Sequence, residues 1–179
     1  YQMGREIAEQ CKAVGINLNF PPCIDINNNS RNPVINSRSF GEDRDKVSRK
    51  AILYMHGMQD GGITTSIKHY PGHGDTETDS HYGLPTIKKS RTELDQMELY
   101  PYRKLISEHP DMVMVGHLNI PALDTTAQSV SSMSYAIVTN LLKKELGYNG
   151  LIITDGMEMK GVRNQNRFEG DVEIRALLA

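Results

Sequence analysis

The sequence has few of the features that mark disulfide-rich, nucleic-acid-binding or membrane-spanning proteins. Its two cysteines, Cys11 and Cys23, are too few for a disulfide framework and form no Cys-x-x-Cys pair. With a formal net charge of −2, the chain lacks the excess of positive charge that is typical of proteins that bind nucleic acid or an anionic membrane. No apolar run approaches the roughly 20 residues needed to cross a bilayer. These absences leave a globular domain, or part of one.

The beginning of the sequence also lacks a targeting signal. YQMGREIAEQ has no initiator methionine, basic n-region or apolar h-region. We therefore expect the sequence to begin inside a longer protein. Cytoplasmic, periplasmic and exported locations all stay open, because both cysteines are interpreted as buried packing thiols that do not report a redox compartment.

Strand-like and helical segments alternate along the chain. Each strand-like segment is a short apolar run without strict alternation, which is typical of a parallel sheet buried on both faces. The expected strands lie near residues 16–26, 63–70, 112–118 and 150–154. The expected helices are residues 1–14, a segment from Asp43 or Asp45 to about 60, a segment from Ser90 or Thr92 to about 108, residues 136–147, and the final stretch VEIRALLA.

Chemically reactive residues follow these apolar runs. They are Asp25, the histidine-rich segment 68–81, His117 and Asp155. In parallel α/β folds, active sites are built at the carboxyl ends of the strands. Four strands fit half of a doubly wound sheet or half of a (β/α)8 barrel, which takes about 250 residues when complete.

The histidine-rich segment KHYPGHGDTETDSH could be a metal site, a catalytic loop or a polar turn. Its H-x-x-x-H spacing resembles that of a helical zinc pair. However, Pro71 and two glycines disfavour a helix, so the spacing loses its geometric meaning and no metal or other cofactor is predicted. The side chains of this segment that could act as metal ligands are His69, His73, Asp75, Asp79 and His81.

Asp79 and His81 suit acid–base chemistry. An aspartate bonded to one ring nitrogen of a histidine orients the ring and raises the basicity of the other nitrogen. Such a histidine can act as a general acid and base near pH 7. Lys68 and His69 can donate hydrogen bonds to adjacent sugar hydroxyls. The alternative interpretations are a polar turn without chemistry, and a strand-end lysine beside a satisfied core histidine.

Three further residues have a functional and a structural interpretation. Asp155 leaves a carboxylate at the mouth of the sheet, or caps the turn that follows it. Met157 shapes an apolar pocket wall, or packs in the core. Arg38 binds an anionic or hydroxyl-rich ligand, or pairs with Glu42 or Asp43.

Together these stretches resemble glycoside hydrolase family 3, in its β-N-acetylhexosaminidase branch. The Lys-His-aromatic-PGHGDT…DSH element is the most specific, because β-glucosidases of that family lack the Asp-x-His pair. The resemblance covers nearly the whole chain, in the family's order and spacing. It is carried by FPPCIDI (20–26), NPVINSRSFGED (32–43), KHYPGHGDT with DSH (68–81), MVMVGHLNIPALD (112–124) and LLKKELGYNGLIITDGMEMKGV (141–162).

The resemblance implies a role for each matching residue. Asp155 matches the catalytic nucleophile, His81 the acid/base and Asp79 its partner. The residues expected to contact the N-acetylated sugar are Arg38, Lys68, His69, His117 and Met157. The chain departs from the family in having Asp155-Gly156 instead of Asp-Asp, and PPCID instead of PVxD.

The implied fold is α/β, the central portion of a (β/α)8 TIM barrel with about four of its eight strands. Residues 1–179 are expected to be a partial catalytic barrel truncated at both ends, because the family takes another sugar-binding Asp and Arg from a segment before Tyr1. Similar versions occur in bacterial proteins that also carry a β-lactamase-like module.

The implied function is that of a retaining exo-β-N-acetylglucosaminidase. It would act on N-acetylglucosamine-containing glycans or muropeptides, as in peptidoglycan recycling. One alternative is a β-N-acetylglucosaminide phosphorylase, because a neutral histidine tolerates an incoming phosphate. Another is an inactive barrel fragment that only binds carbohydrate or has a structural role, and whose open sheet edges favour self-association.

Overall fold

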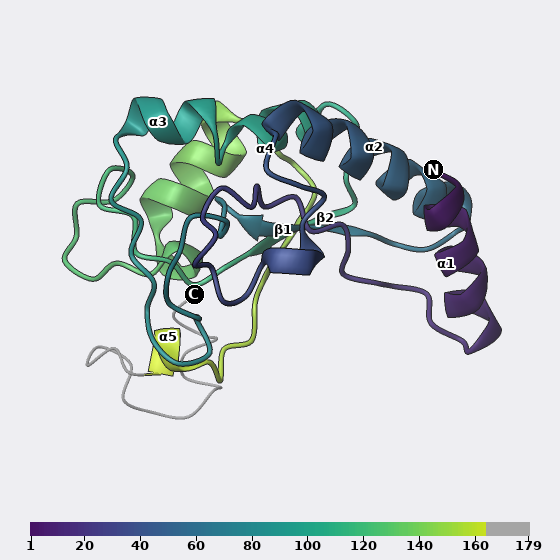
Figure 1. Cartoon of the computed structure of the whole chain (residues 1–179), viewed down its shortest axis with the longest axis horizontal. Helices are drawn as coiled ribbons and strands as arrows, with labels where there is room; N and C mark the ends of the chain where they lie inside the picture. The colour runs from purple at the N-terminus through teal and green to yellow at the C-terminus, as the bar shows by residue number, and fades with distance from the viewer. Residues whose placement is uncertain (164–179) are drawn as a thin grey trace.

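The computed structural model describes residues 1–163 and shows a parallel three-stranded sheet with helices packed against it (Figure 1). The strand order is β1-β2-β3 and both pairings are parallel, which confirms the predicted α/β fold. The final stretch VEIRALLA lies outside the described residues. The elements are α1 (Gln2–Ala13), η1 (Asn36–Arg38), α2 (Arg44–Asp60), β1 (Ser66–Tyr70), α3 (Arg91–Gln96), α4 (Tyr100–Ile106), β2 (Met112–Val115), η2 (Ser131–Met133), η3 (Ala136–Glu145), β3 (Leu151–Thr154) and α5 (Lys160–Arg163).

The segment 16–26, predicted as the first strand, is not a regular strand. It runs parallel to β1 but forms two isolated bridges instead of a ladder: Cys23 pairs with Lys68 of β1, and Leu18 pairs with Thr64, which precedes β1. Pro21 and Pro22 have no N–H group to donate, so they interrupt the ladder of hydrogen bonds. The prediction of a regular strand is therefore wrong, although the segment does lie beside β1 and brings Asp25 to the end of that strand.

The sheet is buried unevenly. All four residues of β2 are buried, whereas Leu151 of β3 is 59% exposed. Within residues 1–163, β3 pairs with a strand only on its β2 side. Segment 16–26, which lies beside β1 at the other edge, also exposes apolar side chains, since Ile16 is 46% and Phe20 44% exposed. Both edges therefore present apolar surface, as expected for part of a larger sheet.

Two helices pack through closely approaching backbones. A Cβ atom on Gly4 of α1 would lie 2.3 Å from the carbonyl oxygen of Tyr54, and one on Gly57 of α2 would lie 2.2 Å from that of Tyr1. Only glycine fits at both positions. The start of α2 is as predicted, because the carboxylate of Asp43 accepts a hydrogen bond from the backbone N–H of Lys46 at 2.8 Å.

The helix predicted from Ser90 to about 108 is divided into α3 and α4. Ser90 caps α3 in a reciprocal capping box with Glu93. Pro101, in the first turn of α4, has no N–H group to continue the hydrogen bonding of α3, so a second helix begins there. The prediction of one continuous helix is therefore wrong. Helix η3 lies where a helix was predicted, with wide i to i+5 hydrogen bonds such as that from Leu146 N to Leu141 O.

The main hydrophobic core lies between the strands and helices α2, α4 and η3. Its largest fully buried side chains include Tyr70 of β1 and Tyr102 of α4, whose rings meet edge to face at 5.0 Å. In Figure 1, α2, α3 and α4 lie along one side of the view, and α5 lies at the opposite side with the loop that leads to it. Among the described residues, no helix is long and apolar enough to cross a membrane.

Candidate active site

A cavity of about 370 Å³ lies where β1 and β3 end. It brings together five of the eight predicted site residues, from four separate segments of the chain. A larger groove of about 700 Å³ lies on the outer side of α2 and α4 and contains none of the predicted site residues. The residues that line the smaller cavity are Phe20, Arg38, Lys68, His69, His81, Met114, Thr154, Asp155 and Gly156.

Asp155 follows β3 directly and presents a carboxylate to this cavity. Its backbone N–H donates to the carbonyl of Val115 at 2.9 Å, which continues the sheet by one residue. Its Oδ1 accepts from the N–H of Gly156 at 2.9 Å, and its Oδ2 lies 3.9 Å from Nε2 of His69. One oxygen therefore stabilises the turn, while the other lies near His69 in the lining of the cavity.

His69 is buried, and both nitrogens of its ring have a polar partner. Nε2 lies 3.2 Å from Nη2 of Arg38, and Nδ1 lies 2.7 Å from Oδ2 of Asp25. A guanidinium can only donate, so Nε2 accepts and Nδ1 carries the proton that is donated to Asp25. These two contacts fix the orientation of the imidazole ring. Arg38 thus lies against His69, rather than pairing with Glu42 or Asp43.

Asp25, for which the sequence suggested a position but no role, organises this region. Its Oδ2 accepts hydrogen bonds from the ring and backbone of His69 and from the thiol of Cys23, at 2.7, 3.2 and 3.2 Å. Its Oδ1 accepts from the backbone N–H of His73 at 2.6 Å. Burial would raise the pKa of Asp25, but its interactions with His69 and His73 lower that pKa to about 2.

Within residues 1–163, Cys23, Asp25 and His69 form a group of side chains that could hold a metal ion. Their ligand atoms all lie within 4.8 Å of one another. Burial and the neighbouring Asp25 raise the pKa of the Cys23 thiol well above its usual range, so the thiol keeps its proton. Cys23 and His69 are both hydrogen-bonded to Asp25, so a metal ion would have to replace these hydrogen bonds.

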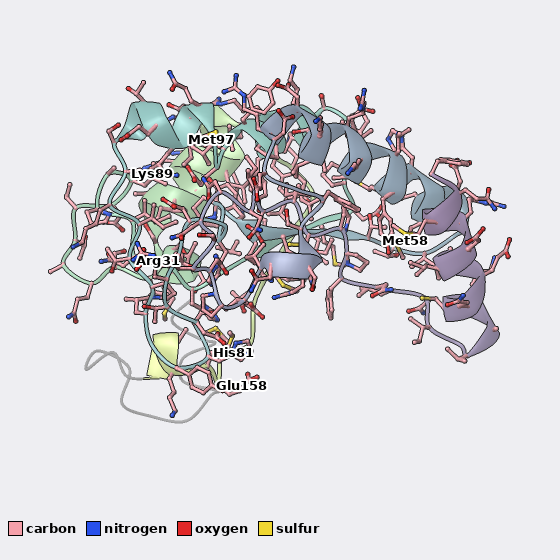
Figure 2. The ribbon with its side chains drawn as sticks, viewed as in Figure 1. Arg31, Met58, His81, Lys89, Met97 and Glu158 are labelled. Atoms are coloured by element: carbon pink, nitrogen blue, oxygen red, sulfur yellow. The ribbon has the colours of Figure 1, made fainter. Side chains whose placement is uncertain are left out.

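Asp79 and His81 form the predicted pair. Oδ1 of Asp79 lies 2.6 Å from Nδ1 of His81 and accepts from its backbone N–H at 2.9 Å. Partial burial opposes ionisation of Asp79, but hydrogen bonds from the backbone and ring of His81 outweigh it and lower the pKa of Asp79. The side chain of His81 is 59% exposed, and it lies toward the end of the molecule that carries α5, away from Met58 on α2 (Figure 2).

His117 and Met157 are not among the residues that line the cavity. His117 is buried, with Nδ1 2.8 Å from Oγ of Ser132 and Nε2 3.0 Å from the carbonyl oxygen of Gly156. Burial lowers the pKa of His117, which favours the neutral ring. His117 therefore contacts the turn that carries Asp155.

Phe20, which no local sequence pattern marks as a site residue, forms part of the cavity wall. Its ring is 44% exposed, and Nζ of Lys68 lies 6.0 Å from the ring centroid. Burial, followed by the nearby Arg38, lowers the pKa of Lys68. The position of Phe20 at the start of the FPPCIDI stretch was the available signal, but nothing in its local spacing indicates that the ring faces a cavity.

Comparison with known proteins gives a consistent assignment. The family described as "Glycosyl hydrolase family 3 N terminal domain" matches residues 1–179. The chain is 40% identical over 166 residues to Beta-hexosaminidase A of Pseudoalteromonas piscicida, covering 87% of this chain and 28% of that protein.

Solved structures agree with this match. A glycoside hydrolase family 3 β-N-acetylglucosaminidase from Paenibacillus sp. str. FPU-7 superposes with a TM-score of 0.90 at 40% identity, covering 93% of this chain and 31% of that one. A β-glucoside phosphorylase superposes with a TM-score of 0.88 at 29% identity, covering 93% and 32%. The chain thus spans about a third of the length of these relatives, and its α/β fold is that of a TIM-barrel-like domain.

Proposed function

The chain belongs to glycosyl hydrolase family 3, and we propose that it forms the catalytic part of a retaining exo-β-N-acetylglucosaminidase. The observation that carries the proposal is that Asp155 and His81 line one cavity, with Asp79 bonded to His81. The names of the relatives, β-hexosaminidase and β-N-acetylglucosaminidase, support the substrate class. The substrates proposed are N-acetylglucosamine-containing glycans or muropeptides.

In the first step, the carboxylate of Asp155 attacks the anomeric carbon of the sugar. The bond between that carbon and the leaving oxygen breaks, and protonated His81 gives its Nε2 proton to that oxygen. The products are a glycosyl ester on Asp155, a free alcohol and neutral His81. Asp79 stabilises the cationic ring before transfer, because its carboxylate contacts Nδ1.

In the second step, neutral His81 accepts a proton from a water molecule that attacks the anomeric carbon. The ester bond breaks, Asp155 leaves as a carboxylate, and the sugar is released with its β configuration retained. His81 is again protonated, so the cycle closes without an external acid or base.

The other cavity residues suit the recognition of a sugar. Arg38 and Lys68 are cationic donors, and His69 is held by Asp25 in one orientation. The exposed face of Phe20 provides an apolar surface for the C–H face of a pyranose ring. Together these groups would hold the terminal sugar with its anomeric carbon toward Asp155.

Phosphorolysis is the second candidate function. The acid/base residue is a histidine, and a neutral imidazole does not repel an incoming phosphate as a carboxylate does. The likeness to a β-glucoside phosphorylase favours this variant. Phosphate would replace water in the second step, and the product would be a sugar 1-phosphate.

The full-length protein and its Asp155→Asn variant test the proposal. The wild type should hydrolyse an aryl β-N-acetylglucosaminide, Asp155→Asn should have no measurable turnover, and Asp60→Asn, at the end of α2, should be unaffected. Assays with and without phosphate, followed for free sugar and sugar 1-phosphate, separate hydrolysis from phosphorolysis. Sugar binding without turnover in the wild type would instead support a non-catalytic role.

A further inference from the structure

His73, which the proposed mechanism does not use, is buried. It contacts Asp25 on one side and the loop that carries Asp79 and His81 on the other. Its backbone N–H donates to Oδ1 of Asp25, whose other oxygen orients His69. Its ring meets the ring of His69 edge to face, with centroids 6.0 Å apart. His73 is thus linked directly to the groups that line the sugar side of the cavity.

The ring of His73 also reaches the loop that carries the acid/base pair. Its Nε2 lies 3.3 Å from Oγ of Ser80, the residue between Asp79 and His81. Ser80 is buried, whereas the neighbouring His81 is exposed and lines the cavity. Ser80 therefore contacts the protein interior, while His81 remains accessible to substrate. The hydroxyl of Thr76 lies 2.7 Å from the other ring nitrogen.

The loop that carries His73 and Ser80 is closely packed against its neighbours. A Cβ atom on Gly74 would lie 1.7 Å from the carbonyl oxygen of Ile26, so the loop backbone lies directly against the segment that carries Asp25. On the far side, the carbonyl of Ser80 accepts from the N–H of Gly161 at 3.0 Å. The side chain of Asn32 donates to the carbonyls of His73 and Gly74 at 2.8 and 3.0 Å.

From this geometry we infer that His73 is a positioning residue, which fixes the acid/base pair Asp79–His81 relative to Asp25 and His69 through its contact with Ser80. The inference rests on the proposed function of His81. The ring contributes through neutral hydrogen bonding, consistent with burial lowering the pKa of His73. Loss of the contact should leave the nucleophile in place and displace only the proton donor.

Substrates with different leaving groups test the inference in the full-length protein. A dinitrophenyl glycoside needs little protonation when it leaves, whereas an alkyl glycoside needs a well-placed acid. We expect His73→Asn to lower kcat/KM for the alkyl glycoside by about ten- to a hundredfold, because small misplacements of a catalytic group carry losses of that order. Its kcat/KM for the dinitrophenyl glycoside should change less than about threefold, since the nucleophile is not moved.

Two variants separate positioning from simple structural damage. His73→Gln places an amide near the position of Nε2 and should recover part of the alkyl-glycoside activity, whereas Asn does not reach Ser80. Ser80→Ala removes only the Ser80 hydroxyl and should reproduce the selective loss even if His73→Asn fails to fold. Ser48→Ala removes an equally buried hydroxyl that bonds within α2, and should show no such selectivity.

The results distinguish this inference from the proposed function. Suppose that His81→Ala shows the leaving-group selectivity while His73→Asn and Ser80→Ala lower kcat/KM equally for both glycosides, or for neither. In that case His73 does not position the acid/base pair. If His81→Ala itself shows no selectivity, the proposed role of His81 fails, and the inference fails with it.

Discussion

Replacing Asp25 by asparagine should expose how strongly the site depends on one buried carboxylate. The four hydrogen bonds that Asp25 accepts come from Cys23, from the backbone and ring of His69, and from the backbone of His73. Asparagine has nearly the same shape but carries an NH₂ group on one side. That group would face N–H donors, so it cannot satisfy the partners on both sides at once.

The size of the effect follows from the pKa of Asp25. A fall in pKa from the ordinary value of 3.8 to about 2 corresponds to a stabilisation of about 2 to 3 kcal/mol, at about 1.4 kcal/mol per pKa unit. Hydrogen bonds to a charged group that contribute about 1.5–3 kcal/mol each give a similar order of magnitude. We therefore expect Asp25→Asn to lower the free energy of unfolding by about 2 to 4 kcal/mol at pH 7.

The pH dependence has a defined sign. The pKa of Asp25 is lower in the folded protein than in the unfolded chain, so its stabilisation is complete above the unfolded pKa near 3.8. It is lost as the pH falls toward the folded value of about 2. The difference in stability between wild type and Asp25→Asn should therefore be constant from pH 7 to about 5 and shrink below about pH 4.

Urea unfolding of both proteins across this pH range provides the measurement. Asp124→Asn is the matched control, because serine and backbone hydrogen bonds also lower the pKa of Asp124 to about 2 despite its partial burial. Asp124 does not line the active-site cavity, so Asp124→Asn should reduce stability without changing kcat/KM. A loss below about 0.5 kcal/mol for Asp25→Asn, or one that is unchanged at pH 3, would refute the reasoning.

Three further predictions concern the acid, metals and the sheet edges. His81→Ala should lower kcat/KM for alkyl glycosides by about 100-fold or more and kcat/KM for dinitrophenyl glycosides far less, because kcat/KM reports the first step; equal losses of kcat/KM would remove His81 from the acid role. A strong chelator should leave activity unchanged, because the proposed mechanism uses only side chains; activity lost on chelation and restored by zinc would overturn that mechanism in favour of a metal site. The 179-residue chain expressed by itself should self-associate in light-scattering measurements, because Leu151 and Phe20 are 59% and 44% exposed at the two sheet edges. A monomeric and fully active chain would contradict the last prediction.

Local patterns predicted most of the fold. The cap at Asp43, the apolar runs of β1, β2 and β3, and their parallel pairing all follow from residues close together in the sequence. Prolines account for two differences between the predicted and the observed elements. Pro21 and Pro22 interrupt the expected first strand, and Pro101 divides the expected helix.

The site was less accessible to sequence reasoning, because its contacts join distant segments. Asp25 lies 44 residues from His69, and no local spacing indicates that the two side chains touch. His117 follows a strand as Asp155 does, but its ring contacts the carbonyl of Gly156 and is not part of the cavity lining. Position at a strand end therefore predicted the neighbourhood of these side chains but not the direction of each.

The central claim is that Asp155 forms a covalent bond with the sugar. A fluorinated N-acetylglucosaminyl donor with a good leaving group should form that ester quickly and hydrolyse it slowly, so the intermediate accumulates. Intact-mass analysis of the full-length protein should show the addition of one sugar, and peptide mapping should place it on the peptide containing Asp155. An active enzyme that accumulates no adduct, or that carries the sugar on another residue, would contradict the assignment of Asp155 as the nucleophile.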